Sequence, residues 1–325
     1  MYFCRPVVRS NQWKHALVNQ SIKVFGTLAY SKLANSVAEQ GGFSRGLFEQ
    51  KEFPDGERYY RLMDNIEDQD AVLIAGTISD RDTLELYDLG WKLSESGARS
   101  LTLVIPFFGY STMERVVHHG EVVMAKSRAH LLSTIPEAGA GNRIVLLDLH
   151  SEGLPYYFDG HVRPVHLYAK QIVMRAAAAL GGKGFVLAST DAGRAKWVES
   201  LANEMGVDAA FIYKRRLDGE RTEVAGINAN VEGRRVIIYD DMIRTGSSLI
   251  QAALAYRDAG ATETFAITTH GLFPHNSLDK IRESGVLSKI ICTDSHPRAL
   301  DLQSDFLEVH SISGLLVDFL ASAHH

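Results

Sequence analysis

Two adjacent carboxylates, Asp240 and Asp241, directly follow an apolar run in VIIYDDMIRTGSSL, residues 236–249. Such a run predicts a strand buried on both faces, whose carboxyl end lies where open α/β sheets bind ligands. A helix is expected over 249–258, and the N–H groups and dipole at a helix N-terminus favour an anion. We therefore expect the preceding loop to hold a phosphate group through Arg244, Thr245, Gly246, Ser247 and Ser248. The simpler alternative is an acidic turn followed by an ordinary helix N-cap.

Carboxylates beside a phosphate loop indicate a ligand that also has hydroxyl groups or a bound divalent metal. The loop has neither the GxxxxGK[ST] spacing of a P-loop nor the GxGxxG spacing of a dinucleotide-binding fold. Vicinal diols donate hydrogen bonds to carboxylates, and Mg²⁺ bridges carboxylate and phosphate oxygens. A sugar phosphate with Mg²⁺ meets both conditions.

His150 and Asp191 are further polar side chains at the ends of apolar runs, in DLH and STDAG. Both are candidates to contact a metal, although a lone histidine at the end of a strand is more often structural. By the period of two in a strand, Asp148 shares a face with His150 and is a candidate to orient it.

Lys214 and Arg216 begin a polar stretch, KRRLDGERTEVAGINANVEGR, with little core-forming pattern. This indicates a mobile loop, and cations on a loop that closes over bound phosphates would stabilise negative charge there. The alternative is an ordinary solvated charge cluster. Phe53, Asp55 and Glu57 lie in KEFPDGERYY, where P-D-G is a turn signal by itself. Taken alone, these residues are expected to form a surface turn.

The elements that must position these residues alternate between short apolar runs and amphipathic segments, as in RRVIIYDD before SSLIQAALAYRDAGA. This order predicts βαβ units with parallel sheets, and therefore the α/β class. The two halves of the chain repeat one pattern of strand, polar loop and helix, which indicates two related domains. We place the boundary near residue 160, within the irregular stretch 150–164, giving domains of 1–160 and 161–325. The tail 309–325 predicts a last strand and a short helix.

The composition of the 325 residues is ordinary for a globular protein, with 46% hydrophobic and 22% charged residues. A net charge of -5 excludes the broad basic surface that holds nucleic acid, so no nucleic-acid partner is expected. Cys4 and Cys292 lie far apart and outside any CxxC pair, so neither structural zinc nor a disulfide framework is expected. Since no apolar run approaches the roughly 18 residues of a membrane span, we expect a cytoplasmic protein without a membrane partner.

The stretch 236–249 resembles the ribose-phosphate binding motif of type I phosphoribosyltransferases and of ribose-phosphate diphosphokinase, which makes phosphoribosyl pyrophosphate (PRPP). Other segments resemble diphosphokinase motifs and follow the family order: FPDGE at 53–57, VIPFFGYSTMER at 104–115, DLH at 148–150, STDAG at 189–193, KRR at 214–216 and THGLF at 269–273. The resemblance implies an α/β fold of two related type I phosphoribosyltransferase-like domains. Each is expected to be a mainly parallel sheet flanked by helices, with the last helix packing back on the N-terminal domain.

The same resemblance implies transfer of the diphosphoryl group of Mg-ATP to O1 of ribose 5-phosphate, giving PRPP and AMP. Lys214 and Arg216 are then the catalytic pair. Ribose 5-phosphate is expected at Asp240, Asp241, Arg244, Thr245, Gly246, Ser247 and Ser248. The nucleotide is expected at Phe53, Asp55, Glu57, Glu114 and Arg115, with Phe53 a candidate to stack on adenine. Mg²⁺ is expected at His150, Asp191, Asp240 and Asp241. In this family the nucleotide loop reaches a neighbouring subunit, so a homo-oligomer with the nucleotide site near a subunit interface is also implied.

Several positions depart from the family pattern. Thr112-Met113-Glu114-Arg115 stands where the bacterial and animal class I enzymes have Arg-Gln-Asp-Arg. The form in this chain is closer to the plant-like class II enzymes, which are less dependent on phosphate activation. Arg244 stands where class I has aspartate, and Gly246-Ser247 where it has Ala-Gly. If Ser247 must adopt a positive φ, the cost is of order 1 kcal/mol.

Two alternatives to a diphosphokinase stay open from the sequence. A phosphoribosyltransferase would consume PRPP, release pyrophosphate and need no ATP, but the paired-domain pattern and the KRR segment argue against it. A catalytically weak paralogue would bind diphosphokinase subunits and regulate them, as the altered Thr112 and Met113 suggest. Retention of Lys214, Arg216 and His150 speaks for catalysis instead.

Overall fold

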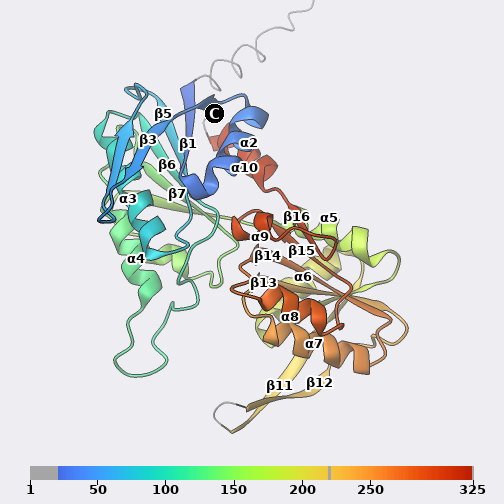
Figure 1. Ribbon diagram of the computed structural model, residues 1–325. Helices are drawn as coiled ribbons and strands as arrows, with labels where there is room; N and C mark the ends of the chain where they lie inside the picture. Colours follow the sequence, from blue (N-terminus) through green and yellow to red (C-terminus); the bar gives the residue numbers. More distant parts are fainter. Residues whose placement is uncertain (1–20, 219–220, 324–325) are drawn as a thin grey trace, which may run out of the picture. The chain divides into compact units, whose positions relative to one another are not determined.

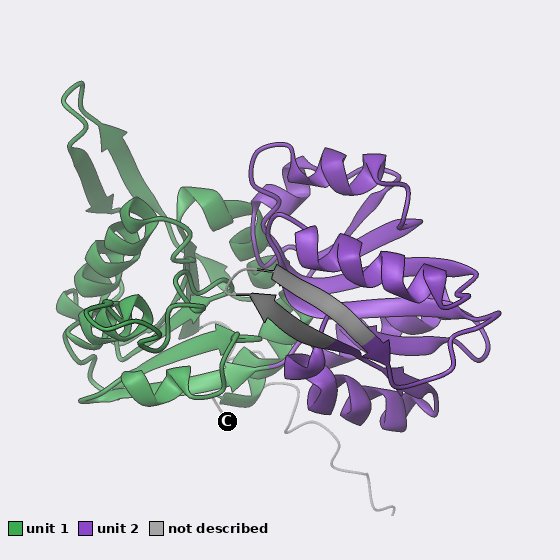
Figure 2. Ribbon diagram, turned by 90° about the horizontal axis from the view of Figure 1, so that it is seen from below, with its two compact units in different colours: residues 1–167, 313–325 green, residues 168–312 purple. Residues whose placement is uncertain are grey.

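The computed structural model describes residues 21–218 and 221–323, whose elements are drawn in Figure 1. The chain divides into two compact units, residues 1–167 with 313–325 and residues 168–312, coloured separately in Figure 2. Unit 1 includes β8 (Val162–Leu167) and the last helix, α10 (Ser313–Ala323). A boundary near residue 160 assigns both of these elements to the other half of the chain.

Unit 1 is built on a six-stranded sheet with the order β2-β1-β5-β6-β7-β8, in which every neighbouring pair is parallel. The central strands are the predicted apolar runs, and all five residues of β5 are buried. Burial on both faces is expected for a parallel sheet covered by helices. With β8, the strands are β1 (Ile22–Gly26), β2 (Ser44–Arg45), β5 (Asp70–Ile74), β6 (Ser100–Ile105) and β7 (Asn142–Leu147).

In the described part of unit 1, the α-helices are α2 (Ser31–Gly41), α3 (Asp80–Glu95), α4 (Met124–Ser133) and α10. In the core, apolar residues of α3 and α4 pack with residues of β5, β6 and β7. Helix α10 packs against α2, where the hydroxyl of Ser313 donates to Gln40 Oε1 at 3.0 Å. The Arg143 guanidinium of β7 donates to the carbonyl of Ala323 at 3.1 Å. These contacts attach the last helix to unit 1.

Unit 2 has a second six-stranded parallel sheet, with the order β10-β9-β13-β14-β15-β16. Its strands are β9 (Val186–Ser189), β10 (Asp208–Ala210), β13 (Arg235–Ile243), β14 (Glu263–Gly271), β15 (Lys289–Thr293) and β16 (Leu307–His310). Its helices are α5 (Lys170–Gly181), α6 (Ala195–Met205), α7 (Ser247–Asp258), α8 (Ser277–Glu283) and α9 (Arg298–Asp301). Two parallel sheets flanked by helices confirm the predicted α/β class. None of the described helices is long and apolar enough to cross a membrane.

Alternate residues of β13 face two different helical layers. Val236 and Ile238 pack in a core with α7, whereas Ile237 and Tyr239 pack in a core with α5 and α6. This alternation is the period of two of a strand buried on both faces. The two faces of β13 therefore belong to different helical layers as far as Tyr239, the residue before Asp240.

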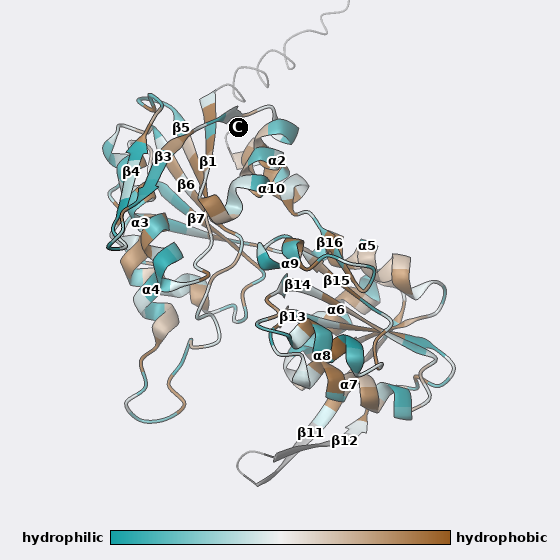
Figure 3. Ribbon diagram, viewed as in Figure 1, coloured by the Kyte–Doolittle hydropathy of each residue, from teal (hydrophilic) through white to brown (hydrophobic). Residues whose placement is uncertain are grey.

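Each unit also contains an antiparallel hairpin at the same place in its topology. Along the chain, the hairpin of β3 (Phe48–Glu52) and β4 (Arg58–Leu62) follows the edge strand β2 and precedes the inner strand β5. Figure 3 draws this hairpin mostly in the teal of hydrophilic residues. Likewise, the hairpin of β11 (Ile212–Asp218) and β12 (Arg221–Ile227) follows the edge strand β10 along the chain and precedes the inner strand β13. No strand was predicted in the polar stretch that begins at Lys214, so this hairpin was missed. Cross-strand backbone hydrogen bonds form this ribbon, and they need no apolar pattern.

Candidate functional site

Asp240 and Asp241 lie near the carboxyl end of β13, beside the end of β9, with which β13 pairs. The hydroxyl of Thr190, just after β9, donates to Asp240 Oδ2 at 2.9 Å. The backbone N–H of Asp241 donates to Asp240 Oδ1 at 3.0 Å. Neighbouring donors thus orient both oxygens of the Asp240 carboxyl group.

The Asp240 carboxyl group has a strongly perturbed pKa. Burial raises the pKa of Asp240 to about 7, and the neighbouring Asp241 adds to the rise, whereas the Thr190 hydrogen bond and Arg194 oppose it. Asp241 is more deeply buried, with 2% of its surface exposed. Two adjacent buried acids disfavour a second negative charge, so a cation next to Asp240 is favoured.

Arg194 joins the site although no sequence motif pointed to it. Its Nη2 lies 2.7 Å from Oδ2 of Asp241, and it ends the short 3-10 helix Ala192–Arg194 that leads into α6. Burial lowers the pKa of Arg194, but the charge of Asp241 and its neighbours raises it by more, so the guanidinium stays charged. The signal that could have found it is an arginine three residues after the strand-end Asp191, at a helix start.

Asp191 lies in the loop that follows β9. Its Oδ1 accepts a hydrogen bond from the N–H of Gly193 at 2.8 Å, and the hydroxyl of Ser189 donates to its carbonyl at 2.6 Å. Because β9 and β13 are parallel neighbours, the loop of Asp191 and the residues Asp240 and Asp241 lie at the same edge of the sheet. The structure therefore brings three of the predicted metal ligands to one edge of unit 2.

The predicted phosphate loop leads directly into α7, which begins at Ser247 and not at the expected residue 249. Gly246 adopts φ 78°, in the left-handed region that favours glycine. Ser247 is helical and has no positive φ, so the strain considered for it does not arise. Arg244, Thr245 and Ser248 are exposed. Since the first N–H groups of a helix have no acceptor within it, this start offers donors to an anion.

Lys214 and Arg216 lie on β11, opposite Val224 and Thr222 of β12. The ladder shifts register after Tyr213 and again after Arg216. The side chains of Lys214 and Arg216 lie outside the part of the chain that the structure describes. Their backbone belongs to a hairpin of unit 2, and their catalytic role stays a prediction.

The candidate nucleotide residues Phe53, Asp55 and Glu57 form the tip of the β3–β4 hairpin. The N–H of Phe53 donates to the carbonyl of Glu57 at 2.8 Å, and Asp55 Oδ1 accepts from the N–H of Glu57 at 3.1 Å. Gly56 completes the turn with φ 92°. The Phe53 side chain is 48% exposed, so its ring is accessible to a stacking partner.

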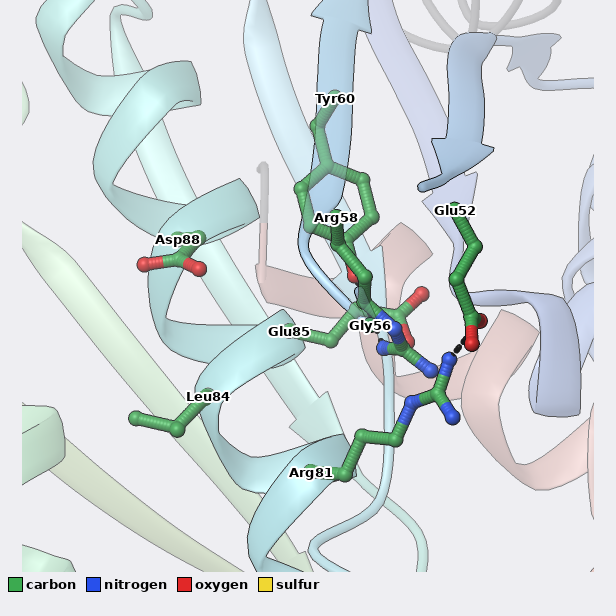
Figure 4. A pocket seen from close by; sticks show the side chains of 8 residues that line it. All are labelled: Glu52, Gly56, Arg58, Tyr60, Arg81, Leu84, Glu85 and Asp88. Carbon is green, nitrogen blue, oxygen red and sulfur yellow. Dashed lines mark hydrogen bonds and ion pairs between the residues drawn. The ribbon is translucent and has the colours of Figure 1, made fainter. Parts of the chain in front are cut away.

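A cavity of about 390 Å³ lies between this hairpin and α3 (Figure 4). Nη1 of Arg58 donates to Glu85 Oε2 at 2.7 Å and to the Tyr60 hydroxyl at 2.9 Å. Burial raises the pKa of Glu85, although Arg58 opposes the rise. Arg81 of α3 pairs with Glu52 of β3. These ion pairs, which the sequence did not predict, hold the hairpin on α3.

The other candidates of unit 1 occupy irregular segments. Arg115 Nε lies 3.6 Å from Glu114 Oε1 between β6 and α4, and the Tyr157 hydroxyl donates to the Glu114 carbonyl at 2.5 Å. His150 is exposed. Asp148 follows the end of β7 with φ 38°, so the expected period of two between Asp148 and His150 is wrong. The strand ends before the alternation reaches these residues.

The described residues contain no cluster of three or more His, Cys, Asp or Glu side chains arranged to hold a metal ion. The predicted ligands belong to different units, His150 to unit 1 and Asp191, Asp240 and Asp241 to unit 2. Mg²⁺ is usually held by one or two carboxylates together with water and substrate phosphates, not by an all-protein cage. The carboxylates at the edge of the unit 2 sheet fit that kind of site.

Comparison with known families shows matches in both units. Residues 22–135 match the N-terminal domain of ribose phosphate pyrophosphokinase, and residues 186–325 match the phosphoribosyl synthetase-associated domain. A ribose-phosphate pyrophosphokinase of Fusobacterium nucleatum is 31% identical over 279 residues, 85% of this chain and 86% of the relative. One of Vibrio parahaemolyticus is 32% identical over 278 residues, 84% of this chain and 86% of the relative.

A solved structure is similar over nearly the whole chain. The crystal structure of phosphoribosylpyrophosphate synthetase from Mycobacterium smegmatis matches with a TM-score of 0.81 and 27% sequence identity. The match covers 93% of this chain and 98% of that chain.

Proposed function

Because this chain belongs to the ribose-phosphate pyrophosphokinase family, we propose that it transfers the diphosphoryl group of Mg-ATP to O1 of ribose 5-phosphate. The O1 oxygen forms a bond with the β-phosphorus of ATP, and the bond from that phosphorus to the oxygen bridging to the α-phosphorus breaks. AMP leaves with the bridging oxygen, the hydroxyl proton is released, and the other product is PRPP. No side-chain nucleophile is needed, since positioning and electrostatics supply the rate.

The observation that carries this proposal is the juxtaposition in unit 2 of Asp240 and the loop that begins α7. In the proposal, the N–H groups of residues 245–248 bind the 5-phosphate, and Arg244 adds positive charge. Asp240 and Asp241 accept hydrogen bonds from the ribose hydroxyls. Donors for a phosphate group and carboxylates that accept hydrogen bonds from hydroxyl groups lie at the same edge of the sheet. This combination suits a sugar phosphate better than a free phosphate or an unphosphorylated sugar.

Lys214 and Arg216 neutralise the charge that develops on the transferred group. A cationic pair on a hairpin that follows an edge strand is suited to closing over bound phosphates. Mg²⁺, when bound, neutralises phosphate oxygens. Asp191, Asp240 and Asp241 are the groups that would hold it in unit 2, and His150 is the candidate ligand in unit 1.

Unit 1 carries the nucleotide loops in this proposal, with ATP contacted by Phe53, Asp55, Glu57, Glu114 and Arg115. The Thr112-Met113-Glu114-Arg115 stretch supports a class II-like member of the family. A cytoplasmic homo-oligomer, in which the β3–β4 hairpin reaches the nucleotide of a neighbouring subunit, is part of the same proposal.

The direct test is to incubate the purified protein with ATP, ribose 5-phosphate and MgCl₂ and to separate the products by ion-exchange chromatography. The proposal predicts equal amounts of AMP and PRPP, and neither without ribose 5-phosphate. A phosphoribosyltransferase would instead release pyrophosphate from PRPP with an acceptor base and without ATP. Absence of AMP over a range of phosphate concentrations would contradict the proposal and favour the regulatory paralogue.

A further inference from the structure

Arg194 and Asp241 form a shielded ion pair at the substrate edge of unit 2. The Asp241 side chain is 3% exposed and that of Arg194 is 21% exposed, and Nη2 and Oδ2 are 2.7 Å apart. Removing one member of such a pair leaves the other as an uncompensated charge in a place that water reaches poorly. The pair is therefore expected to act as one element.

This pair lies on one particular side of β13. Arg194 directly precedes α6, and Trp197 of α6 stacks on Tyr239 with ring centroids 4.1 Å apart. Tyr239 packs in the core on the side of α5 and α6, and Asp241 follows it by one period of the strand. Asp240 is held instead by Thr190. The two adjacent acids consequently have different partners, one a hydroxyl and the other a guanidinium.

The different partners bear on how an anion can bind beside two carboxylates. The loop at 244–248 must accept a phosphate within a few residues of Asp240 and Asp241, whose negative charges oppose it. The guanidinium of Arg194 offsets the charge of Asp241, and it comes from the loop after β9, not from the phosphate loop itself. The net negative charge next to the phosphate loop is thus smaller than the sequence of residues 240–248 indicates.

We propose that Arg194 is a positioning residue for ribose 5-phosphate: it holds the Asp241 carboxylate in place and offsets its charge, so that the sugar phosphate can bind. This inference rests on the proposed function and extends it to a residue outside the recognised motifs. Arg194 acts through Asp241, so its loss affects sugar-phosphate binding more than the transfer step. The nucleotide, whose proposed contacts with the protein lie in loops of unit 1, is affected less.

The test measures binding of ribose 5-phosphate alone by isothermal titration calorimetry, together with KM and kcat. Arg194→Gln should raise the Kd and the KM for ribose 5-phosphate about tenfold or more. The kcat at saturation and the KM for Mg-ATP should change by no more than about threefold. Arg194→Lys, which keeps the charge but loses the planar fork, should recover part of the affinity.

Arg234→Gln is the control, since Arg234 also pairs with an aspartate: its Nη1 lies 2.6 Å from Oδ2 of Asp208, and the two side chains are 27% and 67% exposed. Arg234 lies just before β13, away from its carboxyl end, so its loss should leave ribose 5-phosphate binding unchanged. The double variant Arg194→Gln with Asp241→Asn should bind ribose 5-phosphate more tightly than the combined losses of affinity in the two single variants predict, because neither charge is left without its partner.

The outcomes separate this inference from the proposed function. If the wild-type protein fails to bind ribose 5-phosphate, the proposed function is wrong and the inference falls with it. If the wild type binds but Arg194→Gln binds equally well, only the inference is wrong. Equal losses of affinity and thermal stability in Arg194→Gln, Arg194→Lys and Arg234→Gln would show a merely structural role and would also overturn it.

Discussion

Gly246 faces Ile281 so closely that a Cβ at residue 246 would lie 2.3 Å from the Cδ1 atom of Ile281. Ile281 belongs to α8 and is fully buried, so its side chain has little room to move. Gly246 also has φ 78°, which L side chains adopt only with strain. Close approach and backbone conformation together make glycine necessary where the phosphate loop enters α7.

Gly246→Ala is therefore expected to lower both stability and affinity for ribose 5-phosphate. Left-handed strain costs about 1 kcal/mol and the overlap with Ile281 about 1–3 kcal/mol more. Gly206→Ala is the control, because Gly206 has φ 67° but a Cβ there would have no neighbouring atom within 4 Å. Urea unfolding should show the smaller loss for Gly206→Ala, and calorimetry should show weaker ribose 5-phosphate binding only for Gly246→Ala. Equal binding by the two variants would contradict the assigned role of this loop.

Lys214→Ala should reduce kcat by about 10²–10³-fold and leave ribose 5-phosphate binding nearly intact, because its charge is needed only as transfer proceeds. Steady-state rates of AMP formation and calorimetric Kd values measure the two effects. Lys183→Ala, at an exposed position before β9, is the control and should behave as wild type. Loss of ribose 5-phosphate binding in Lys214→Ala would show that the lysine supports the site structurally.

Phe53→Ala should raise the KM for ATP about tenfold, since stacking of a base on an aromatic ring contributes about 1–3 kcal/mol. Binding of ribose 5-phosphate should not change, because Phe53 lies at the tip of the unit 1 hairpin. Tyr59→Ala removes another exposed aromatic ring from the same hairpin, on β4, and should leave the KM for ATP unchanged. An unchanged KM in Phe53→Ala would leave the loop as the plain surface turn that its sequence also allows.

His296 predicts a loss of stability on acidification. Burial lowers the pKa of His296 to about 4, and the nearby His270 and Arg298 contribute to the lowering. The unfolded chain takes up this proton near pH 6.5 but the folded chain only near pH 4, so stability falls as the pH drops through this window. The contribution is about 2 kcal/mol between pH 7.5 and pH 5. Urea unfolding should show this part of the pH dependence in wild type and not in His296→Gln. The same slope in both proteins would assign it to other groups.

Much of the site could be predicted from short segments, because the physical signal is local. An apolar run followed by acids predicts a buried strand whose end presents Asp240 and Asp241, and the loop before a helix predicts an anion site. The same reasoning placed Asp191 at the end of β9. The two hairpins were missed because antiparallel ribbons are held by backbone hydrogen bonds and carry little apolar alternation. The start of α7 was placed two residues too late because Ser247 and Ser248 are polar and exposed.

The sequence by itself determined the α/β class, the alternation of parallel-sheet strands with helices, and the residue types that follow the main strands. Only the tertiary structure decided which of those residues are partners. Arg194 reaches Asp241 because β9 and β13 are neighbours in the sheet, although a hairpin and an edge strand separate them along the chain. Local periodicity determines which face a side chain occupies, but the order of strands in a sheet depends on packing across the whole unit. The partner that offsets the charge of Asp241 could therefore be identified only in the folded protein.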